Sequence, residues 1–254
     1  KAMLPIDLTG RNALVTGGSR GVGRAAALLL AQAGAHVGIS YRSRHEDARA
    51  VVDSIESLGA RGWAHASDIG TEAGSDSLFE ACDREFDGLD IFVGNAGIWP
   101  PVDVAFGDMT ADQWRNTMAV NLDSTFYTTR GAIRRIRPGG SIVLVSSTAG
   151  QRGEAFHGDY ASSKGAQISL VKGLCVELGG MDVNVNAVAP GWIDTEMSAD
   201  AIAAAGDSIA RNIPLGRVAS AEDVAGPILF LCSPLARHIT GEIVNVNGGA
   251  VLVG

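Results

Sequence analysis

Two side chains that could move a proton stand four residues apart, Tyr160 and Lys164. Both belong to the stretch 160–178, which predicts a long helix, so they share one helical face. A nearby ammonium favours phenolate, and we therefore expect Lys164 to lower the pKa of Tyr160 from about 10. A third candidate is the hydroxyl of Ser147, which follows an apolar run at 141–145 typical of a buried strand. The Tyr/Lys pair is a weak signal alone, because so short a pattern also occurs on solvated helix faces.

A glycine-rich loop connects a short apolar strand at 12–16 to a strong helix at 24–33. Its glycines Gly17, Gly21 and Gly23 let the backbone approach a ligand closely, and the helix N-terminus offers free N–H groups to a phosphate. The order of strand, glycine loop and helix predicts a site for the pyrophosphate of a dinucleotide. The alternative interpretation is a glycine-rich turn that binds no ligand.

The next expected strand, at 35–41, decides the choice of cofactor. In NAD-preferring sites an acidic residue about 20 residues beyond the glycine loop binds the ribose diol. Here the strand runs instead into Arg42, Ser43 and Arg44, and Arg20 stands inside the glycine loop. Guanidinium groups bind a 2′-phosphate, which a carboxylate would repel. We predict NADP, with NAD as the weaker alternative; the competing interpretation is that the arginines are solvated loop charges.

The rest of the chain alternates apolar runs with helical patterns, which predicts a parallel sheet covered by helices on both faces. Further strands are expected at 61–66, 89–93, 141–146, 183–188 and 242–246, and further helices at 46–58, 75–86, 111–136, 160–178 and 221–232. We predict an α/β fold, a doubly wound parallel sheet of about seven strands in three layers. Residues 1–254 then form a single dinucleotide-binding and catalytic domain, in which 192–213 show no clear single element and are interpreted as a mobile lid over the substrate.

Composition excludes several classes of function. The chain has 254 residues with 46% hydrophobic content, enough for one large core. Its net charge of −8 argues against nucleic-acid or anionic-membrane binding. The three cysteines lie far apart, no apolar stretch approaches a membrane span, and no signal peptide opens the sequence, so we expect a cytoplasmic protein. The five histidines show no metal-ligand spacing, and we expect no metal.

Taken together, these residues make the chain resemble the classical short-chain dehydrogenase/reductase family, which has a Rossmann-like fold. The resemblance covers essentially the whole length. It rests on Thr16-Gly17-x-x-x-Gly21-x-Gly23, Asp68, Asn95-Ala96-Gly97, Asn121, Ser147, Tyr160-x-x-x-Lys164 and Pro190-Gly191 followed by Thr195. Their joint presence in this order makes chance agreement negligible.

The resemblance implies four catalytic residues. Tyr160 would protonate the substrate oxygen, Ser147 would hydrogen-bond that oxygen, and Lys164 would hold the nicotinamide ribose. Asn121 would hold a water that links Lys164 to bulk solvent. One departure from the family pattern, Ser163 in place of a common Ala, is expected to matter little.

The resemblance also implies a set of cofactor contacts. Asp68 would meet the adenine and Thr195 the carboxamide, while Asn95 and Gly97 would meet the adenosine ribose and the cofactor backbone. The full set is Gly17, Ser19, Arg20, Gly21, Val22, Gly23, Arg42, Ser43, Asp68, Ile69, Asn95, Ala96, Gly97, Tyr160, Lys164, Pro190, Gly191, Ile193 and Thr195.

We predict hydride transfer between NADP(H) and a small or medium, largely apolar ketone or secondary alcohol. The candidate substrate contacts are Trp99, Glu154, His157, Trp192 and Met197. An alternative substrate is an acyl chain on an acyl carrier protein, as in the 3-oxoacyl-[acyl carrier protein] reductases that the chain also resembles. The arginines at 130–137 would then meet the acidic carrier, although they equally suit the C-terminal end of a helix dipole.

Two rival functions on the same fold are a halide-expelling relative and a non-enzymatic nucleotide sensor. The first lacks the glycine loop and the second usually lacks the Tyr/Lys pair, and this chain keeps both. The resemblance further implies a homotetramer, built partly from the helices expected at 111–136 and 160–178.

Overall fold

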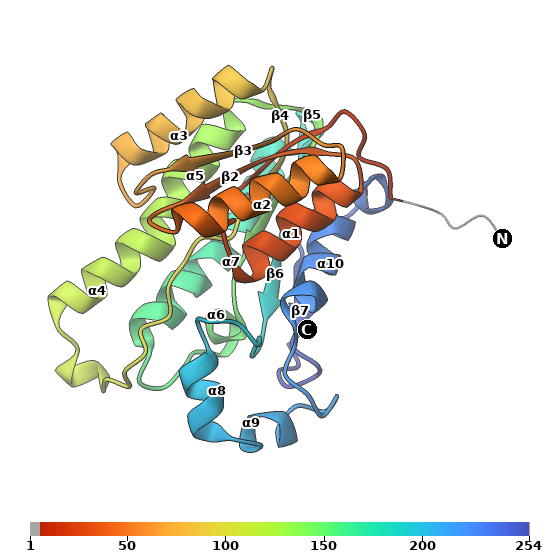
Figure 1. Cartoon of the computed structure of the whole chain (residues 1–254). Helices are drawn as coiled ribbons and strands as arrows, with labels where there is room; N and C mark the ends of the chain where they lie inside the picture. The colour runs from red at the N-terminus through yellow and green to blue at the C-terminus, as the bar shows by residue number, and fades with distance from the viewer. Residues whose placement is uncertain (1–5, 254) are drawn as a thin grey trace.

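The structure, a computed structural model, describes residues 6–253. Seven parallel strands form one sheet in the order β3-β2-β1-β4-β5-β6-β7 (Figure 1). The strands are β1 Asn12–Val15, β2 His36–Tyr41, β3 Gly62–Ala66, β4 Leu89–Gly94, β5 Ile136–Val145, β6 Asn184–Pro190 and β7 Ile243–Val246. Strands β1, β4 and β6 are buried at every residue, as expected for parallel strands that helices cover on both faces.

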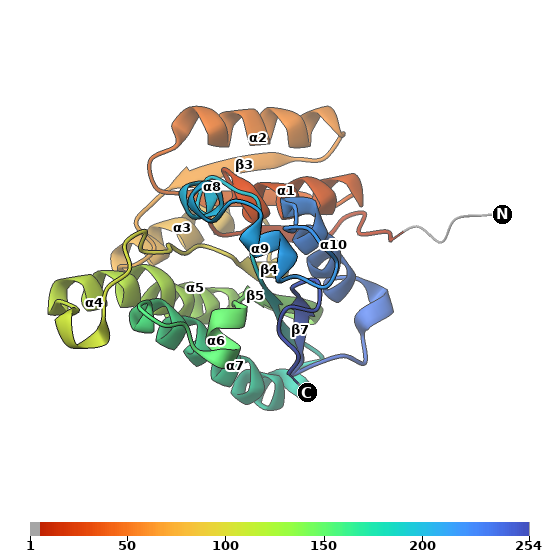
Figure 2. The ribbon, with the colours of Figure 1, turned by 90° about the horizontal axis from the view of Figure 1, so that it is seen from below.

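Helices cover both faces of the sheet, so the predicted three layers are confirmed. They are α1 Gly21–Gln32, α2 His45–Ser57, α3 Glu72–Glu85, α4 Ala111–Met118, α5 Ser124–Ile133, α6 Thr148–Arg152, α7 Gly158–Gly179, α8 Ala199–Ala205, α9 Ser208–Arg211 and α10 Ala221–Leu231. Helices α1, α2 and α10 pack on one face, and α3, α5 and α7 on the other (Figure 2). Within residues 6–253, no helix is long and apolar enough to cross a bilayer.

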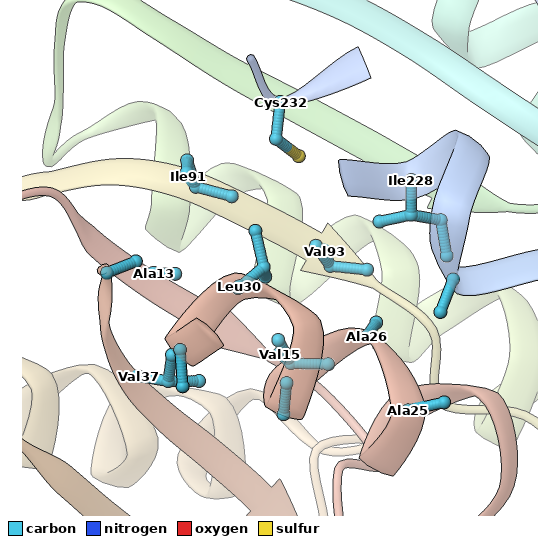
Figure 3. Packing of buried hydrophobic residues seen from close by; sticks show 14 of the residues in the cluster. Ala13, Val15, Ala25, Ala26, Leu30, Val37, Ile91, Val93, Ile228 and Cys232 are labelled. Carbon is cyan, nitrogen blue, oxygen red and sulfur yellow. The ribbon is translucent and has the colours of Figure 1, made fainter. Parts of the chain in front are cut away.

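Each face of the sheet has its own hydrophobic core. On one face, Ala26 and Leu30 of α1 and Ile228 of α10 pack over Val15 and Val93 of the central strands (Figure 3). Alanine both favours the helix and keeps its contact face thin, which lets α1 lie against α10. The other core is filled by larger side chains, including Phe79 of α3 and Val171 of α7, which pack with Leu144 of β5.

The strand order reverses beside β1, and this determines where a ligand can bind. The chain runs from β1 outward through β2 to β3, then returns to place β4 on the other side of β1. A crevice forms where the two connections leave the carboxyl ends of β1 and β4 in opposite directions. The glycine loop and the Asn95-Ala96-Gly97 segment both begin at this point.

The prediction of a single helix at 111–136 is wrong, because the structure divides this stretch into two helices. A π turn at Ala119–Asp123, which contains Asn121, separates α4 from α5. Such turns interrupt the regular hydrogen-bond ladder and are frequent at functional sites. The side chain of Gln167, on α7, donates to the Asn121 carbonyl at 3.1 Å, so a neighbouring helix satisfies backbone at the interruption.

Strand β5 also begins earlier than expected, at Ile136. Ile136 pairs with Leu89 of β4, and the pairing resumes only at Ser141 with Ile91. Residues 138–140, where the pairing with β4 is interrupted, therefore lie inside the strand as a bulge.

The lid segment 192–213 has more local structure than its sequence indicated. It contains the short helices α8 and α9, and Ile193 forms an isolated parallel bridge with Ala219. The mobility of this segment stays a prediction.

The pairing of β2 with β3 generates a test of packing. Gly38 lies opposite Trp63, and a Cβ on Gly38 would lie 2.2 Å from the indole. We expect Gly38→Ala to lower the free energy of unfolding by about 1–3 kcal/mol, because the buried indole must move. The matched control is Gly107→Ala, where a Cβ meets nothing within 4 Å. Urea unfolding that gives both variants wild-type stability would contradict the proposed packing constraint.

Candidate active site

A cavity of about 360 Å³ follows the carboxyl edge of the sheet across the strand reversal. One end is bounded by Arg20, Arg42 and Arg44, and the other by Tyr160 and Lys164. The rest of its wall includes Gly17, Ser19, Gly21, Val22, Ser43, Asp68, Ile69, Asn95, Ala96, Gly97, Ser147, Pro190, Gly191, Ile193 and Thr195. Apart from Gly23, every predicted cofactor contact lines this cavity.

The glycine loop leaves room that side chains would fill. Gly21 has a φ of +52°, and a Cβ there would lie 3.5 Å from Thr195 across the cavity. Gly23 does not line the cavity, which corrects its predicted role as a direct contact. A Cβ on Gly23 would lie 2.3 Å from the Gly17 carbonyl oxygen, so this glycine lets α1 approach the loop. The cradle fits the pyrophosphate of a dinucleotide at the N-terminus of α1.

Asn95 fixes the loop rather than presenting its amide to a ribose. Its side-chain nitrogen donates to the carbonyl oxygens of Thr16 and Gly17 at 2.9 and 3.2 Å. The backbone N–H groups of Asn95 and Ala96 both donate to the Thr16 hydroxyl. In this structure the Asn95 amide therefore links the ends of β1 and β4.

The predicted arginines lie at the far end of the cavity, and each contacts a carboxylate. Arg42 lies 3.3 Å from Asp68, the residue expected at the adenine. Arg20 and Arg44 both contact Glu196, at 2.6 and 2.9 Å. In the sequence Arg44 stands out only as part of a basic run, and Glu196 was not predicted. The sequence signal that could have indicated Glu196 is its position directly after Thr195, a predicted cofactor contact.

Tyr160 and Ser147 meet at the inner end of the cavity. Enclosure by neighbouring groups raises the pKa of Tyr160, the Glu154 carboxylate raises it further, and a hydrogen bond from Ser147 opposes part of the shift. The prediction that Lys164 lowers the pKa of Tyr160 is therefore not what the structure shows. The phenol is therefore protonated at neutral pH, as an ordinary tyrosine is, and this is the form that a proton donor needs.

The amine of Lys164 is buried and donates a hydrogen bond to the backbone. Lys164 is 4% exposed, and its Nζ donates to the Val145 carbonyl at 2.8 Å. The same Nζ lies 5.8 Å from the centre of the Tyr160 ring. Burial lowers the pKa of Lys164 to about 8, because the charged form loses its hydration.

Asn121 lies behind the cavity and positions the loop that follows β4. Its side chain accepts from the Ile98 N–H at 2.7 Å and donates to the Ile98 carbonyl at 3.0 Å. It also donates to Ser163, whose hydroxyl donates to the Tyr160 carbonyl. Ser163 is fully buried, so the expectation that it matters little overlooked a link between Asn121 and the Tyr160 backbone. The proton-relay role of Asn121 stays a prediction.

A second cavity, of about 470 Å³, meets the first at the reacting groups. The two share Ser147, Tyr160, Gly191, Ile193, Thr195 and Met197. The second cavity contains four of the predicted substrate contacts, Trp99, Glu154, Trp192 and Met197. The expected lid segment also contributes Ser198, Ser208, Ile209, Asn212 and Ile213. Residues that the sequence did not indicate complete the cavity, namely Thr148, Ala149, Arg152, Ala250 and Val251.

His157 was predicted to line the substrate site, and the structure corrects this. The ring is 5% exposed and stacks behind Trp99 with ring centres 3.9 Å apart. Its Nε2 lies 3.0 Å from the Asp103 carboxylate. Trp99 in turn places its ring edge-on to Tyr160 at 4.7 Å, so His157 supports the wall of the cavity from outside.

Within residues 6–253, no group of His, Cys, Asp and Glu side chains is arranged to hold a metal ion. Where the two cavities meet, the hydroxyls of Tyr160 and Ser147 and the nearby amine of Lys164 are groups that can exchange protons with a ligand.

The chain is similar to known proteins over nearly its whole length. Residues 17–251 match the family described as enoyl-(acyl carrier protein) reductase. The chain is 40% identical to 3-oxoacyl-[acyl-carrier-protein] reductase of Aquifex aeolicus over 97% of its length and 99% of the relative. It is 38% identical to versicolorin reductase of Emericella nidulans, with 96% of each covered. A short-chain dehydrogenase from Burkholderia cenocepacia, solved in complex with NADP, superposes with a TM-score of 0.90 at 37% identity, covering 96% of this chain and 98% of that one.

The burial of Lys164 predicts a stability cost that depends on pH. The folded state holds the proton less tightly than the unfolded chain, since the pKa falls from 10.5 to about 8. The cost is complete below about pH 8, and stability recovers as pH rises toward 10.5. Lys164→Met should therefore be more stable than wild type by about 1–3 kcal/mol near pH 7, after the loss of one hydrogen bond.

Urea unfolding near pH 7 and pH 10 tests this, and the gain should shrink at the higher pH. Lys172→Met is the control, because Lys172 is an exposed lysine of the same helix. A Lys164→Met gain that is absent, or that stays the same at both pH values, would contradict the assigned cost.

Proposed function

Because the chain belongs to the short-chain dehydrogenase/reductase family, we propose that it transfers hydride between NADP(H) and a small or medium, largely apolar ketone or secondary alcohol. Family membership makes it an NAD(P)-dependent oxidoreductase that acts on CH–OH donors. One observation carries the finer proposal. The long cavity and the second cavity meet at the hydroxyls of Tyr160 and Ser147, where a carbonyl oxygen could accept both hydrogen bonds.

When bound, the nicotinamide supplies the hydride. The chain's own residues then handle the oxygen and the proton. Ser147 donates a hydrogen bond to the substrate oxygen and fixes its position, and Tyr160 transfers its phenolic proton to the same oxygen. With its pKa raised, Tyr160 carries that proton at neutral pH and can donate it during ketone reduction. Lys164, buried beside Gly97, holds the ribose end of the cofactor.

The choice of NADP rests on the arginines at the adenosine end. Arg20, Arg42 and Arg44 come from two different connections and face one part of the cavity. No carboxylate follows β2 in the position that would bind a ribose diol. The B. cenocepacia relative was solved with NADP, which is consistent with this assignment.

The proposed apolar substrate follows from the walls of the second cavity. The ring centres of Trp99 and Trp192 lie 6.2 Å apart. Ile209, Ile213 and Val251 line the same cavity. Arg152 and Glu154 form an ion pair at 2.6 Å that satisfies both charges. Because each charge already has a partner, neither side chain requires a substrate group of opposite charge.

A second candidate function is reduction of an acyl chain carried by an acyl carrier protein, favoured by the identity to the A. aeolicus enzyme. The arginines expected to meet such a carrier are largely neutralised within the chain. Arg130 contacts Glu72, Arg135 contacts Asp83 through both carboxylate oxygens, and Arg137 contacts Asp87. We therefore rank the free ketone first. Faster turnover of a 3-oxoacyl group on the carrier than on coenzyme A would reverse that order.

The homotetramer and the cytoplasmic location stay predictions. Phe126 on α5 and Val176 on α7 are 50% and 80% exposed, which is compatible with contact between copies along these helices.

The role of Tyr160 as proton donor predicts the effect of removing its hydroxyl. Tyr160→Phe should lower kcat for ketone reduction by at least about a hundredfold, since general acid catalysis contributes roughly 10²–10⁴. Affinity for NADPH should change little. Oxidation of NADPH with a ketone panel and NADPH titration are the two measurements, with Tyr127→Phe, a tyrosine outside both cavities, as control. Wild-type turnover in Tyr160→Phe would remove the assignment.

The arginines predict how cofactor preference can be inverted. Arg20→Ala combined with Arg42→Asp should shift the ratio of kcat/KM for NADPH over NADH by about ten- to hundredfold toward NADH, because phosphate loses charge-assisted bonds and meets a new carboxylate. The control is Arg115→Ala, an exposed arginine on α4. A wild type that prefers NADH, or a double variant with an unchanged ratio at the same ionic strength, would overturn the NADP assignment.

A further inference from the structure

A carboxylate from the lid segment bridges the two arginines at the adenosine end of the long cavity. One carboxylate oxygen of Glu196 accepts from Arg20 at 2.6 Å and lies 2.9 Å from a guanidinium nitrogen of Arg44. Arg20 precedes the first turn of α1 and Arg44 precedes the first turn of α2. Two guanidiniums from separate helices thus converge on one anionic oxygen.

This arrangement is the one that a phosphate monoester would require. Guanidinium groups on two sides of an oxyanion bind phosphate and carboxylate by the same charge-assisted hydrogen bonds. All three side chains line the cavity, so a 2′-phosphate at this end would meet the same donors. The hydrogen bond from Arg20 lowers the pKa of Glu196, so the side chain carries its negative charge throughout the physiological pH range.

We propose that Glu196 is a specificity-determining residue that competes with the 2′-phosphate of NADP for Arg20 and Arg44. The proposal rests on the assignment of NADP as cofactor. A 2′-phosphate must displace the Glu196 carboxylate or share its donors at the cost of repulsion between two anions. A ribose diol carries no charge and leaves the Glu196 contacts intact. Glu196 therefore lowers the preference for NADP below the value that the arginines alone would give.

The competition is local to this carboxylate. Arg42, the third arginine, contacts Asp68 and makes no contact with Glu196 among the described residues. Asp200, the next acidic residue of the lid segment, is exposed on α8 and forms no ion pair within residues 6–253. Asp200→Asn thus removes the same charge from the same segment without touching the arginines, and it serves as the matched control.

Binding of adenosine phosphates tests the proposal without reference to turnover. Adenosine 2′,5′-bisphosphate and adenosine 5′-monophosphate differ only in the 2′-phosphate, and NADPH and NADH extend the comparison to whole cofactors. Glu196→Gln should tighten the bisphosphate and NADPH by about three- to tenfold, the range expected from freeing two exposed arginines. The monophosphate and NADH should bind as they do to wild type. The gain should fall as salt is added, because the contacts are exposed.

Calorimetric titration of wild type, Glu196→Gln, Glu196→Ala and Asp200→Asn at one ionic strength gives the four dissociation constants for each. Glu196→Ala is included because the glutamine of Glu196→Gln could still accept hydrogen bonds from the arginines, whereas alanine cannot. Unchanged or weaker binding of the bisphosphate in both Glu196 variants would overturn the proposal, as would equal tightening of all four ligands or the same gain in Asp200→Asn.

The same titrations separate this inference from the assignment of NADP. A wild type that binds the bisphosphate no better than the monophosphate would overturn that assignment and this inference with it. A wild type that prefers the bisphosphate, together with Glu196 variants that keep the same ratio, would overturn only the role of Glu196.

Discussion

Two buried hydrogen bonds join helix α7 to the end of strand β5, and the reaction centre depends on them. Lys164 donates from its side chain to the Val145 carbonyl at 2.8 Å, and Ser146 donates to the Lys164 carbonyl at 2.9 Å. Ser147, next along the chain, is thereby held at a fixed place relative to Tyr160, one helical turn before Lys164. The fold bears the cost of the buried ammonium because two large hydrophobic cores on either side of the sheet stabilise the surrounding structure.

The π turn in the neighbouring helix extends this arrangement to the cofactor cavity. Asn121 occupies that turn and holds both backbone polar groups of Ile98, while Ser163 connects it to the carbonyl of Tyr160. The loop after β4 and the start of α7 are thus positioned by one buried side chain. Buried polar networks of this kind specify geometry because every unmade hydrogen bond would be costly.

Alternation of strand and helix patterns was enough to predict the sheet and its layers. The family resemblance added the cofactor contacts, and all of these except Gly23 line the long cavity. The predictions that failed concern burial and contacts between side chains that are far apart in sequence. Glu196 lies far from Arg20 in sequence, so nothing local indicated their contact. The direction of the Tyr160 pKa depends on burial, which residue spacing does not report. His157 was predicted to line the substrate cavity because it is near Tyr160 in sequence, yet its ring lies behind Trp99.

One stretch of chain, from Gly191 to Met197, contributes to the walls of both cavities. Any adjustment of this stretch by an occupant of one cavity changes the shape of the other. Thermodynamic linkage requires the effect to be mutual. If a ligand in one cavity changes the affinity for a ligand in the other, the second ligand changes the affinity for the first by the same factor. Evolution of substrate range in this protein is therefore tied to cofactor affinity, and a directed-evolution campaign that mutates this stretch selects for both at once.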